Sequence, residues 1–180
     1  MAGNHGKWVE VERVLKAARM MAGTQATSLI VGLGAAAARA REVARREGLW
    51  NVRVVGFVPP QNVAAYFSAI DVGLCPYDKN KGSDAQCPLR LLSYSAAGSA
   101  VVCTELEEVK RMGFSNVTFA DPRPESIARA VEMALARPRT QPDAIERYDI
   151  RHLAAAYERV LADTAEGEDF ADPRQWPVAV

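Results

Sequence analysis

The chain has 180 residues, and 22 lysines and arginines balance 22 aspartates and glutamates, so its formal net charge is zero. This balance argues against a general polyanion binder, and we expect no nucleic-acid partner, because such binding needs a positive surplus that displaces counterions. No apolar run approaches the roughly 20 residues that span a bilayer, and no basic segment leads into an apolar stretch at the N-terminus, so we expect a cytoplasmic protein.

Short runs rich in β-branched residues alternate with helical patterns along the chain. In chain order, the sequence predicts a helix at 9–21, a strand at 28–31, a helix at 35–47, a strand at 52–57, a helix at 63–68, a strand at 71–75, a helix at 89–97, a strand at 100–103, a helix at 105–112, a strand at 117–119, and helices at 126–136 and 150–162. This alternation indicates an α/β fold, with a single Rossmann-like doubly wound parallel sheet and helices on both faces. We expect residues 1–162 to form this domain and residues 163–180 to form a mobile C-terminal tail.

The start of the chain departs from this pattern. Residues 3–6 (GNHG) are typical of a loop between a strand and a helix, but only Met1 and Ala2 remain to form the strand before it. The first strand of a doubly wound sheet is central, and its loss would expose unpaired backbone groups on its neighbours. We therefore expect a truncated first strand, in a chain that is a fragment of a longer protein or whose recorded start lies too late.

Ligands of such sheets bind at the carboxyl ends of the strands, which directs attention to the loops there. The first of these loops, residues 3–7 (GNHGK), combines glycines with a helix N-terminus and a lysine, a combination that suits an anion. The spacing is not that of a Walker loop. A plain strand-to-helix turn is the alternative interpretation.

Two further loops have features of a binding pocket. Residues 31–34 (VGLG) follow a strand and open a helix, but they lack the third glycine of the dinucleotide fingerprint, so NAD is not the expected ligand. Residues 56–60 (GFVPP) end a strand with two prolines, and their rigid backbone could hold the edge of a planar base. A stiff loop without a ligand is the alternative.

Among the loops at the strand ends, the segment 76–98 (PYDKNKGSDAQCPLRLLSYSAAG) has the largest number of polar side chains near the start of a helix. A polar loop, expected to be flexible, leads to Pro88, Leu89 and Arg90 at the beginning of a helix. Free N–H groups there, with the arginine nearby, suit a diphosphate. The alternative is a solvated loop and a helix of small residues packed on the sheet.

Other chemistries have little support in the sequence. The three cysteines (Cys75, Cys87 and Cys103) form no CxxC pair and are expected to be reduced. His5 and His152 show no ligand spacing with them, so we expect no metal site. No Ser/His/Asp triad is visible, so the sequence offers no catalytic residues for a hydrolase.

Taken in order, these segments resemble the C-terminal domain of GT-B-fold glycosyltransferases, above all those of the retaining family 4. The resemblance covers about residues 3–161 and rests on the series GNHGKW, LIVGLG, NVRVVGFVPPQNVAAYFSAIDVGLCPY, PLRLLSYSAAGSAVVCTEL and YDIRHLAAAYERVLAD. It implies the half of the enzyme that binds a UDP- or GDP-linked sugar, which is a substrate, and it implies no separate cofactor.

The resemblance also implies roles for individual positions. Lys7 is at the basic position that pairs with the diphosphate, and Asn4 is where many members have arginine. The backbone of Val58 would hold the base, and Arg90 matches a lysine or arginine common in one branch of the family. The implied donor contacts are Gly3, Asn4, Gly6, Lys7, Gly32, Gly34, Val58, Pro59, Pro88, Leu89, Arg90 and Ser93.

The sequence departs from the family at its hallmark, two glutamates eight positions apart. The second glutamate, which contacts the ribose, corresponds to Ser93, and the first corresponds to Ala85 with Asp84 beside it as the candidate substitute. A neutral hydroxyl bond is about half as strong as a charge-assisted one, so donor affinity should fall. The implied catalytic residues are therefore Lys7, Arg90 and Asp84.

In this fold the acceptor site lies largely in an N-terminal domain, which would be the missing or separate partner. The chain alone is expected to bind a nucleotide sugar without transferring it. Full-length members often rest on the cytoplasmic membrane surface through that other domain, although nothing in this chain indicates membrane contact. The alternatives are a degenerate, non-catalytic nucleotide-sugar-binding or protein-interaction module and, with less support, a sugar epimerase of the same fold.

Overall fold

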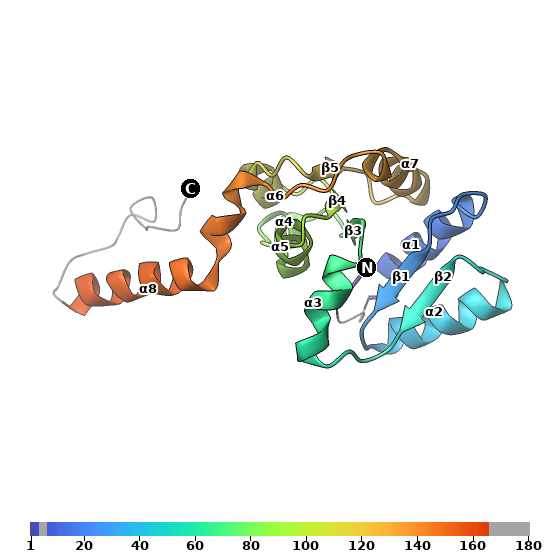
Figure 1. Ribbon diagram of the computed structural model, residues 1–180, viewed down its shortest axis with the longest axis horizontal. Coiled ribbons are helices and arrows are strands. Elements are labelled where there is room, and N and C mark those ends of the chain that lie inside the picture. The colour runs from blue at the N-terminus through green and yellow to red at the C-terminus, as the bar shows by residue number, and fades with distance from the viewer. Residues whose placement is uncertain (4–6, 166–180) are drawn as a thin grey trace.

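A computed structural model describes residues 1–3 and 7–165, in which parallel strands alternate with helices (Figure 1). The strands are β1 (Ser28–Val31), β2 (Val52–Val55), β3 (Val72–Cys75), β4 (Ala100–Cys103) and β5 (Val117–Phe119). The helices are α1 (Trp8–Met20), α2 (Ala35–Arg46), α3 (Pro60–Ser68), α4 (Lys81–Asp84), α5 (Leu89–Ala96), α6 (Glu107–Met112), α7 (Pro124–Leu135), the 3-10 helix η1 (Asp143–Tyr148) and α8 (Ile150–Ala165). The expected α/β, Rossmann-like fold is confirmed.

The boundaries differ from the sequence prediction where prolines or caps intervene. The second strand ends at Val55, two residues early, and α3 begins at Pro60 rather than at residue 63. Proline fits the first turn of a helix because the N–H that it lacks would have no helical partner there. Neither α4 nor η1 was expected from the sequence.

All strand pairs are parallel, but the strands form two hydrogen-bonded groups. One group is β1–β2, in which Ile30 lies opposite Val54. The other has the order β3–β4–β5, in which Leu74 lies opposite Val102. The continuous sheet predicted from the sequence is therefore divided between β1 and β3.

Residues 1–3 pair with β1 at the position of the expected first strand. The Met1 amine donates to the Leu29 carbonyl at 2.6 Å, and Val31 N–H donates to the Met1 carbonyl at 2.9 Å. Gly3 N–H donates to the Val31 carbonyl at 3.0 Å. These bonds form an isolated parallel β-bridge between Ala2 and Val31.

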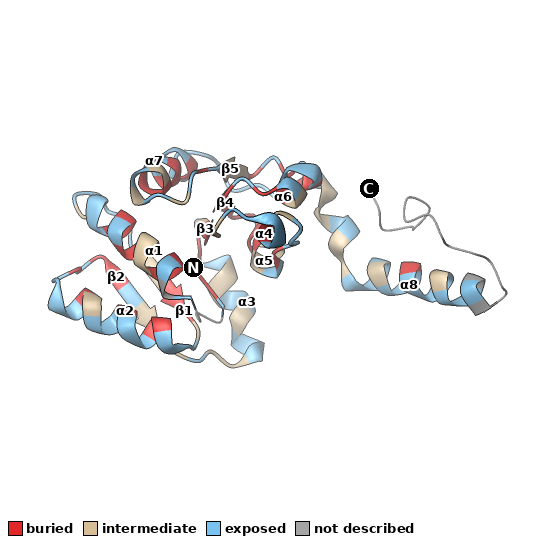
Figure 2. Ribbon diagram, turned by 180° about the vertical axis from the view of Figure 1, so that it is seen from behind, coloured by how far each residue is buried: buried red, intermediate tan, exposed pale blue. Residues whose placement is uncertain are grey.

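The core lies on both faces of the strands (Figure 2). On one face, side chains of α1, α2 and α7 pack against Ile30, Leu74 and Val102. On the other face, side chains of α3, α5, α6 and η1 pack against Val31 and Val101. The division of apolar residues between two faces explains why β3 and β4 are apolar throughout instead of alternating.

Helix α5 crosses β3 unusually closely at Gly73. A Cβ atom on Gly73 would lie 2.2 Å from the ring of Tyr94, which is fully buried. This approach lets the Tyr94 hydroxyl accept a hydrogen bond from Ala2 N–H at 2.8 Å. The tyrosine therefore joins the N-terminal segment to the β3–β4–β5 group.

Helix α8 extends away from the rest of the molecule (Figure 1). Its side chains Ile150, Tyr157 and Leu161 are exposed. The helix continues to Ala165, and residues 166–180, most of the predicted tail, lie outside the described part of the chain. The predicted domain boundary at residue 162 stays a prediction. Within the described residues, none of the helices has the length and apolar character that a membrane span requires.

Candidate functional site

The backbones of Gly3 and Gly32 meet where residues 1–3 and β1 end. Gly32 has a φ of 126°, and a Cβ atom there would lie 1.9 Å from the Gly3 carbonyl oxygen. Gly32 N–H donates to the Val55 carbonyl at 3.1 Å, which ties this point to the end of β2. Only glycine fits such an approach at this φ. The structure thus brings together two of the loops selected from the sequence.

Arg90 reaches this glycine turn from the first turn of α5. Its Nη2 atom lies 3.8 Å from the position that a Cβ atom on Gly3 would occupy. Its guanidinium carbon lies 5.3 Å from the centre of the Tyr77 ring, within the range of a cation–π contact. The arginine is therefore held between the N-terminal segment and the loop after β3.

One nitrogen of the Arg90 guanidinium has no hydrogen-bond partner among the described residues. Within the described residues, Arg90 Nη1 and Asp84 Oδ1 are buried side-chain atoms without a hydrogen bond. Leaving a buried polar atom unpaired costs roughly 1–3 kcal/mol, and more for a charged group. An anion placed against Arg90 would remove this penalty.

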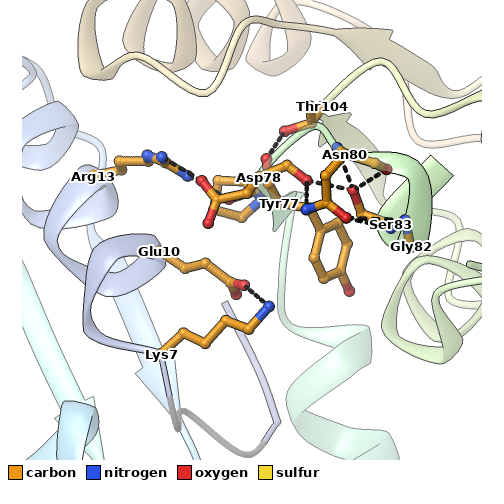
Figure 3. Close-up of polar contacts among 10 residues, drawn as sticks. Lys7, Glu10, Arg13, Tyr77, Asp78, Asn80, Gly82, Ser83 and Thr104 are labelled. Carbon is orange, nitrogen blue, oxygen red and sulfur yellow. Dashed lines mark hydrogen bonds and ion pairs between the residues drawn. The ribbon is translucent and has the colours of Figure 1, made fainter.

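Lys7 and Glu10 add opposite charges to the same region. Lys7 Nζ lies 3.9 Å from Glu10 Oε1, one helical turn away (Figure 3). Glu10 is buried, and this burial raises the pKa of its carboxyl group although the charges of Arg90 and Lys7 act in the opposite direction. Sequence reasoning missed Glu10, although its place three residues after Lys7 puts both side chains on one face of α1.

The loop after β3 was expected to be flexible, but several of its polar groups are bonded within the protein. Arg13 Nη2 lies 2.6 Å from Asp78 Oδ1, and the Thr104 hydroxyl donates to the Tyr77 carbonyl at 2.8 Å (Figure 3). Asn80 and Ser83 form a capping box, in which the Asn80 side chain accepts from Ser83 N–H at 3.1 Å and Ser83 Oγ accepts from Asn80 N–H at 2.9 Å.

The same loop has one more internal bond. The Ser83 hydroxyl, which is buried, also donates to the Asp78 carbonyl. Local bonds of this kind satisfy the polar groups within the loop instead of leaving them to solvent. The segment that carries Asp84 is therefore fixed by its own side chains.

Comparison with known proteins agrees with this architecture. The profile of the family described as "Glycosyl transferases group 1" matches residues 1–137 of the 180 in the chain. The chain belongs to this family. The assignment covers all five strands and every residue of the candidate site. Membership of family 4 in particular stays a resemblance.

A glycosyltransferase relative is similar over a shorter stretch. TuaH of Bacillus subtilis (strain 168), whose name proposes a role as a teichuronic acid biosynthesis glycosyltransferase, is 37% identical over 62 residues. These residues are 34% of this chain and 16% of the relative. The chain therefore matches a small part of that relative's length.

The remaining predicted positions of this group 1 domain differ in exposure. Gly34 caps α2 with a φ of 120°, and Pro59 caps α3. Val58 is half-buried and packs against the second core cluster. Leu89 is exposed, whereas Pro88 is buried. Asn4 and Gly6 lie outside the described residues, so their predicted roles stay predictions.

The two positions that correspond to the family glutamates, Ser93 and Ala85, differ in the chemical groups that they offer to a ligand. Ser93 Oγ donates to the Leu89 carbonyl at 3.0 Å, so its proton is used within α5 and only its oxygen lone pairs face outward. Ala85 is exposed and ends α4. Asp84, its neighbour, has the unpaired carboxylate oxygen described above. Neither replacement supplies a free, fully exposed carboxylate.

The cysteines contribute no chemistry to this site. Cys75 and Cys103 lie opposite each other in β3 and β4, and both are buried free thiols, whereas Cys87 is an exposed free thiol. A hydrogen bond with the Cys75 thiol, together with burial, raises the pKa of Cys103 far above its usual value. A thiol so reluctant to ionise is a poor nucleophile.

Proposed function

We propose that the chain is the donor-binding half of a retaining glycosyltransferase, which binds the diphosphate of a UDP- or GDP-linked sugar against Arg90. Family membership supports sugar transfer in general. The observation that carries the finer proposal is the buried, unpaired Nη1 atom of Arg90 beside the Gly3 backbone. A diphosphate supplies the negative oxygens that such a guanidinium lacks.

The surroundings of Arg90 suit a phosphate group in two further ways. The lack of a side chain at Gly3 leaves the Arg90 guanidinium as the nearest group on that side, with Nη2 3.8 Å from the position that a Cβ atom would occupy. Lys7 is exposed and supplies a second cation, which can leave Glu10 for a phosphate because their separation of 3.9 Å is long for an ion pair. Two cations meet the charge of a diphosphate, and the proposal needs no metal ion.

In this proposal, the rest of the donor molecule extends from the diphosphate bound at Arg90. The backbone of Val58, at the end of β2, would bind the base, and the Ser93 oxygen would accept a bond from a ribose hydroxyl. In the transfer itself, the bond between the sugar and the diphosphate breaks, the acceptor oxygen forms the new bond on the same face, and the proton of the acceptor hydroxyl passes to an oxygen of the leaving diphosphate. Arg90 and Lys7 would stabilise the charge on the leaving diphosphate, and Asp84 would stand in for the first family glutamate.

The acceptor would be bound by an N-terminal domain across a cleft, so this chain alone should bind the donor without transferring the sugar. A binding-only module is the second candidate function. It is favoured by the absence of both family glutamates, since Ala85 cannot ionise and the Ser93 hydroxyl donates its proton within α5. The two candidates agree on nucleotide-sugar binding and differ only in whether a longer protein transfers the sugar.

Calorimetric titration with UDP, GDP and their sugars tests the shared part of the proposal. We expect saturable binding of at least one of these ligands, and Arg90→Met should weaken it by roughly 10-fold or more because a charged hydrogen bond is lost. Arg129→Met, an exposed change on α7, is the matched control and should leave binding unchanged. Absence of binding at millimolar concentrations of every ligand would contradict the proposal.

Transfer activity separates the two candidates. The chain is joined to, or mixed with, an N-terminal acceptor domain of a group 1 glycosyltransferase, and the release of free UDP or GDP is measured with acceptor present. We expect release that depends on Arg90 and on both domains. Binding of the donor without any release would favour the binding-only module.

A further inference from the structure

A groove lies between α2 and β2, at the outer edge of the β1–β2 group. It has a volume of about 370 Å³ and is lined by residues of α2, of β2 and of the turn that joins them. Its buried lining is apolar and comprises Ala44, Leu49 and Val52. Its exposed lining carries two positive charges and one aromatic ring, from Arg41, Arg45 and Trp50. The proposed donor contacts include no residue of this groove.

Trp50 is fixed by its backbone although its side chain is 61% exposed. Its N–H group donates to the Gly48 carbonyl at 2.9 Å, and its carbonyl accepts a hydrogen bond from Arg53 Nη1 at 2.6 Å. Leu49 N–H donates to the Ala44 carbonyl at 2.9 Å, which ties the turn to the end of α2. The exposed indole is therefore an ordered apolar surface, and binding a partner there costs little additional ordering.

The outer edge of β2 is closed to a pairing strand. The Val55 carbonyl accepts a hydrogen bond from the β1 side, so by alternation Val52 and Val54 direct their backbone groups outward. Arg41 Nη2 donates to the Val54 carbonyl at 3.3 Å, and Arg53 Nη1 donates to the Val52 carbonyl at 3.3 Å. A guanidinium has five N–H groups, so each arginine keeps donors for an anion. The groove therefore suits the side chains of a partner and not its backbone.

Opposite charges gather in two distant parts of this neutral chain. Residues 35–53, which form α2, the turn and the start of β2, contain five arginines and two glutamates. Residues 163–172 (DTAEGEDFAD) contain five acidic residues and no lysine or arginine. Within them, Phe170 is an aromatic residue with aspartates on both sides, Asp169 and Asp172. This segment thus has the charge and the ring that match a basic groove with an exposed indole.

Helix α8 carries the acidic segment away from the groove of its own chain. The helix has 16 residues and is about 24 Å long. In both ribbon views it extends from one end of the molecule, whereas α2 lies at the other end (Figures 1 and 2). Phe170 follows the end of α8 by five residues, which span at most roughly 17 Å. The groove within its reach is therefore that of a second molecule.

We propose that the groove between α2 and β2 binds the acidic segment around Phe170 of a second copy of this chain. The Phe170 ring packs against Trp50 over the apolar lining, and the flanking aspartates accept hydrogen bonds from the two arginines of the groove. Arg45 exchanges its exposed contact with Glu42, at 2.8 Å, for one with the segment. The contact is heterologous, so each copy offers one groove and one segment. Because the contact is small, we expect a Kd on the order of 10–100 μM.

Sedimentation velocity of the full chain at low salt tests this association. The weight-average sedimentation coefficient should rise with protein concentration, and Trp50→Ser and Phe170→Ser should each weaken the association by roughly 10-fold or more. Two matched controls should leave it unchanged: Phe57→Ser, at an aromatic residue that is 65% exposed outside the groove, and Trp176→Ser, beyond the acidic segment. Circular dichroism checks that every variant is folded. A chain that stays monomeric at every concentration would overturn the proposal.

A mixing experiment distinguishes this contact from nonspecific association. The Trp50→Ser chain keeps its acidic segment and the Phe170→Ser chain keeps its groove, so each should be monomeric alone. Their mixture should form a one-to-one pair that does not grow further, because only one intact groove and one intact segment are present. A mixture that stays monomeric, or one that forms larger assemblies, would overturn the assignment.

Salt and charge variants test the ionic part of the contact. Association of the full chain should weaken at least roughly 10-fold between 50 and 500 mM salt, because exposed charges are screened. The double change Arg41→Gln and Arg45→Gln should weaken it similarly at low salt. Arg129→Gln, an exposed change on α7, is the matched control and should leave it unchanged. Association that is insensitive both to salt and to the double change would contradict recognition of an acidic segment.

Discussion

At the scale of single residues, the contact between the Gly3 carbonyl and Gly32 allows no side chain. We predict that Gly32→Ala lowers the free energy of unfolding by at least about 2 kcal/mol, because a Cβ atom would lie 1.9 Å from that oxygen at a φ of 126°. Urea unfolding measures this change. Gly23→Ala is the control, since a Cβ atom there meets nothing within 4 Å. Equal effects of the two substitutions would show that the close approach does not exist in solution.

A second prediction at this scale concerns pH. Burial raises the pKa of Glu10 above its ordinary 4.5, so folding favours the protonated carboxyl group. The stability that this group contributes is present at low pH and is lost as pH rises through the folded-state pKa. The charged carboxylate lies near the proposed diphosphate. We expect affinity for a UDP-sugar to rise as pH falls from 8 toward 5, by at least roughly threefold.

Glu10→Gln isolates this effect, because it keeps the size of the side chain and removes its charge. Calorimetric titration across the same pH range should give a nearly flat profile for this variant, with affinity at pH 8 close to that of the unmodified protein at pH 5. Glu42→Gln, an exposed change on α2, should retain the original profile. A slope that survives in Glu10→Gln would assign the pH dependence to another group.

At the scale of elements, Tyr94 links α5 to the N-terminal segment across β3. Tyr94→Phe would leave the buried Ala2 N–H without its acceptor, so we predict a loss of about 1–3 kcal/mol in the free energy of unfolding. Chemical denaturation measures the loss, and Tyr157→Phe, at a tyrosine that is 66% exposed, should cost nothing. An unchanged stability in Tyr94→Phe would mean that water replaces the hydroxyl at Ala2.

The elements also show how far sequence reasoning reaches. The strands were predictable because each is a short apolar run bounded by polar residues or glycine, and their parallel order followed from the helices between them. The capping box of Asn80 and Ser83 was harder to predict, since the usual pattern has glutamate or glutamine three residues after the cap and this chain has serine there. Glu10 was less accessible, because its burial beside Arg90 depends on packing between α1 and α5 and not on local spacing.

The division of the sheet could be anticipated only in part. The sequence predicted that too few residues precede the glycine loop to form a strand, and this stays a prediction. It gave no measure of the space left between β1 and β3, which depends on how α7 and β3 pack around Met1. The site residues at 3, 32 and 90 were predictable as a group because all follow from one rule, that ligands bind at strand ends.

At the scale of the whole molecule, α8 contributes little to the core. Its exposed apolar side chains and its extension from the body (Figure 1) predict that a chain ending at Asp149 keeps its unfolding midpoint within about 2 °C. A chain ending at Arg137 should lose far more, because Arg139 donates to the carbonyls of Ile70 and Ala97 at 2.7 and 2.8 Å. Differential scanning calorimetry compares the three lengths. A large loss on removing α8 alone would show that the helix folds back on the body in solution.

Helix α5 connects the candidate donor site to the junction between Tyr94 and Ala2. Its first turn presents Arg90 and its second turn presents Tyr94, so the same helix touches the anion-facing cation and the junction with Ala2. A compound that immobilises Arg90 would also hold that junction closed and would slow its thermal opening. Melting temperature can therefore serve as a label-free screen in which candidate donors are ranked before any acceptor is known.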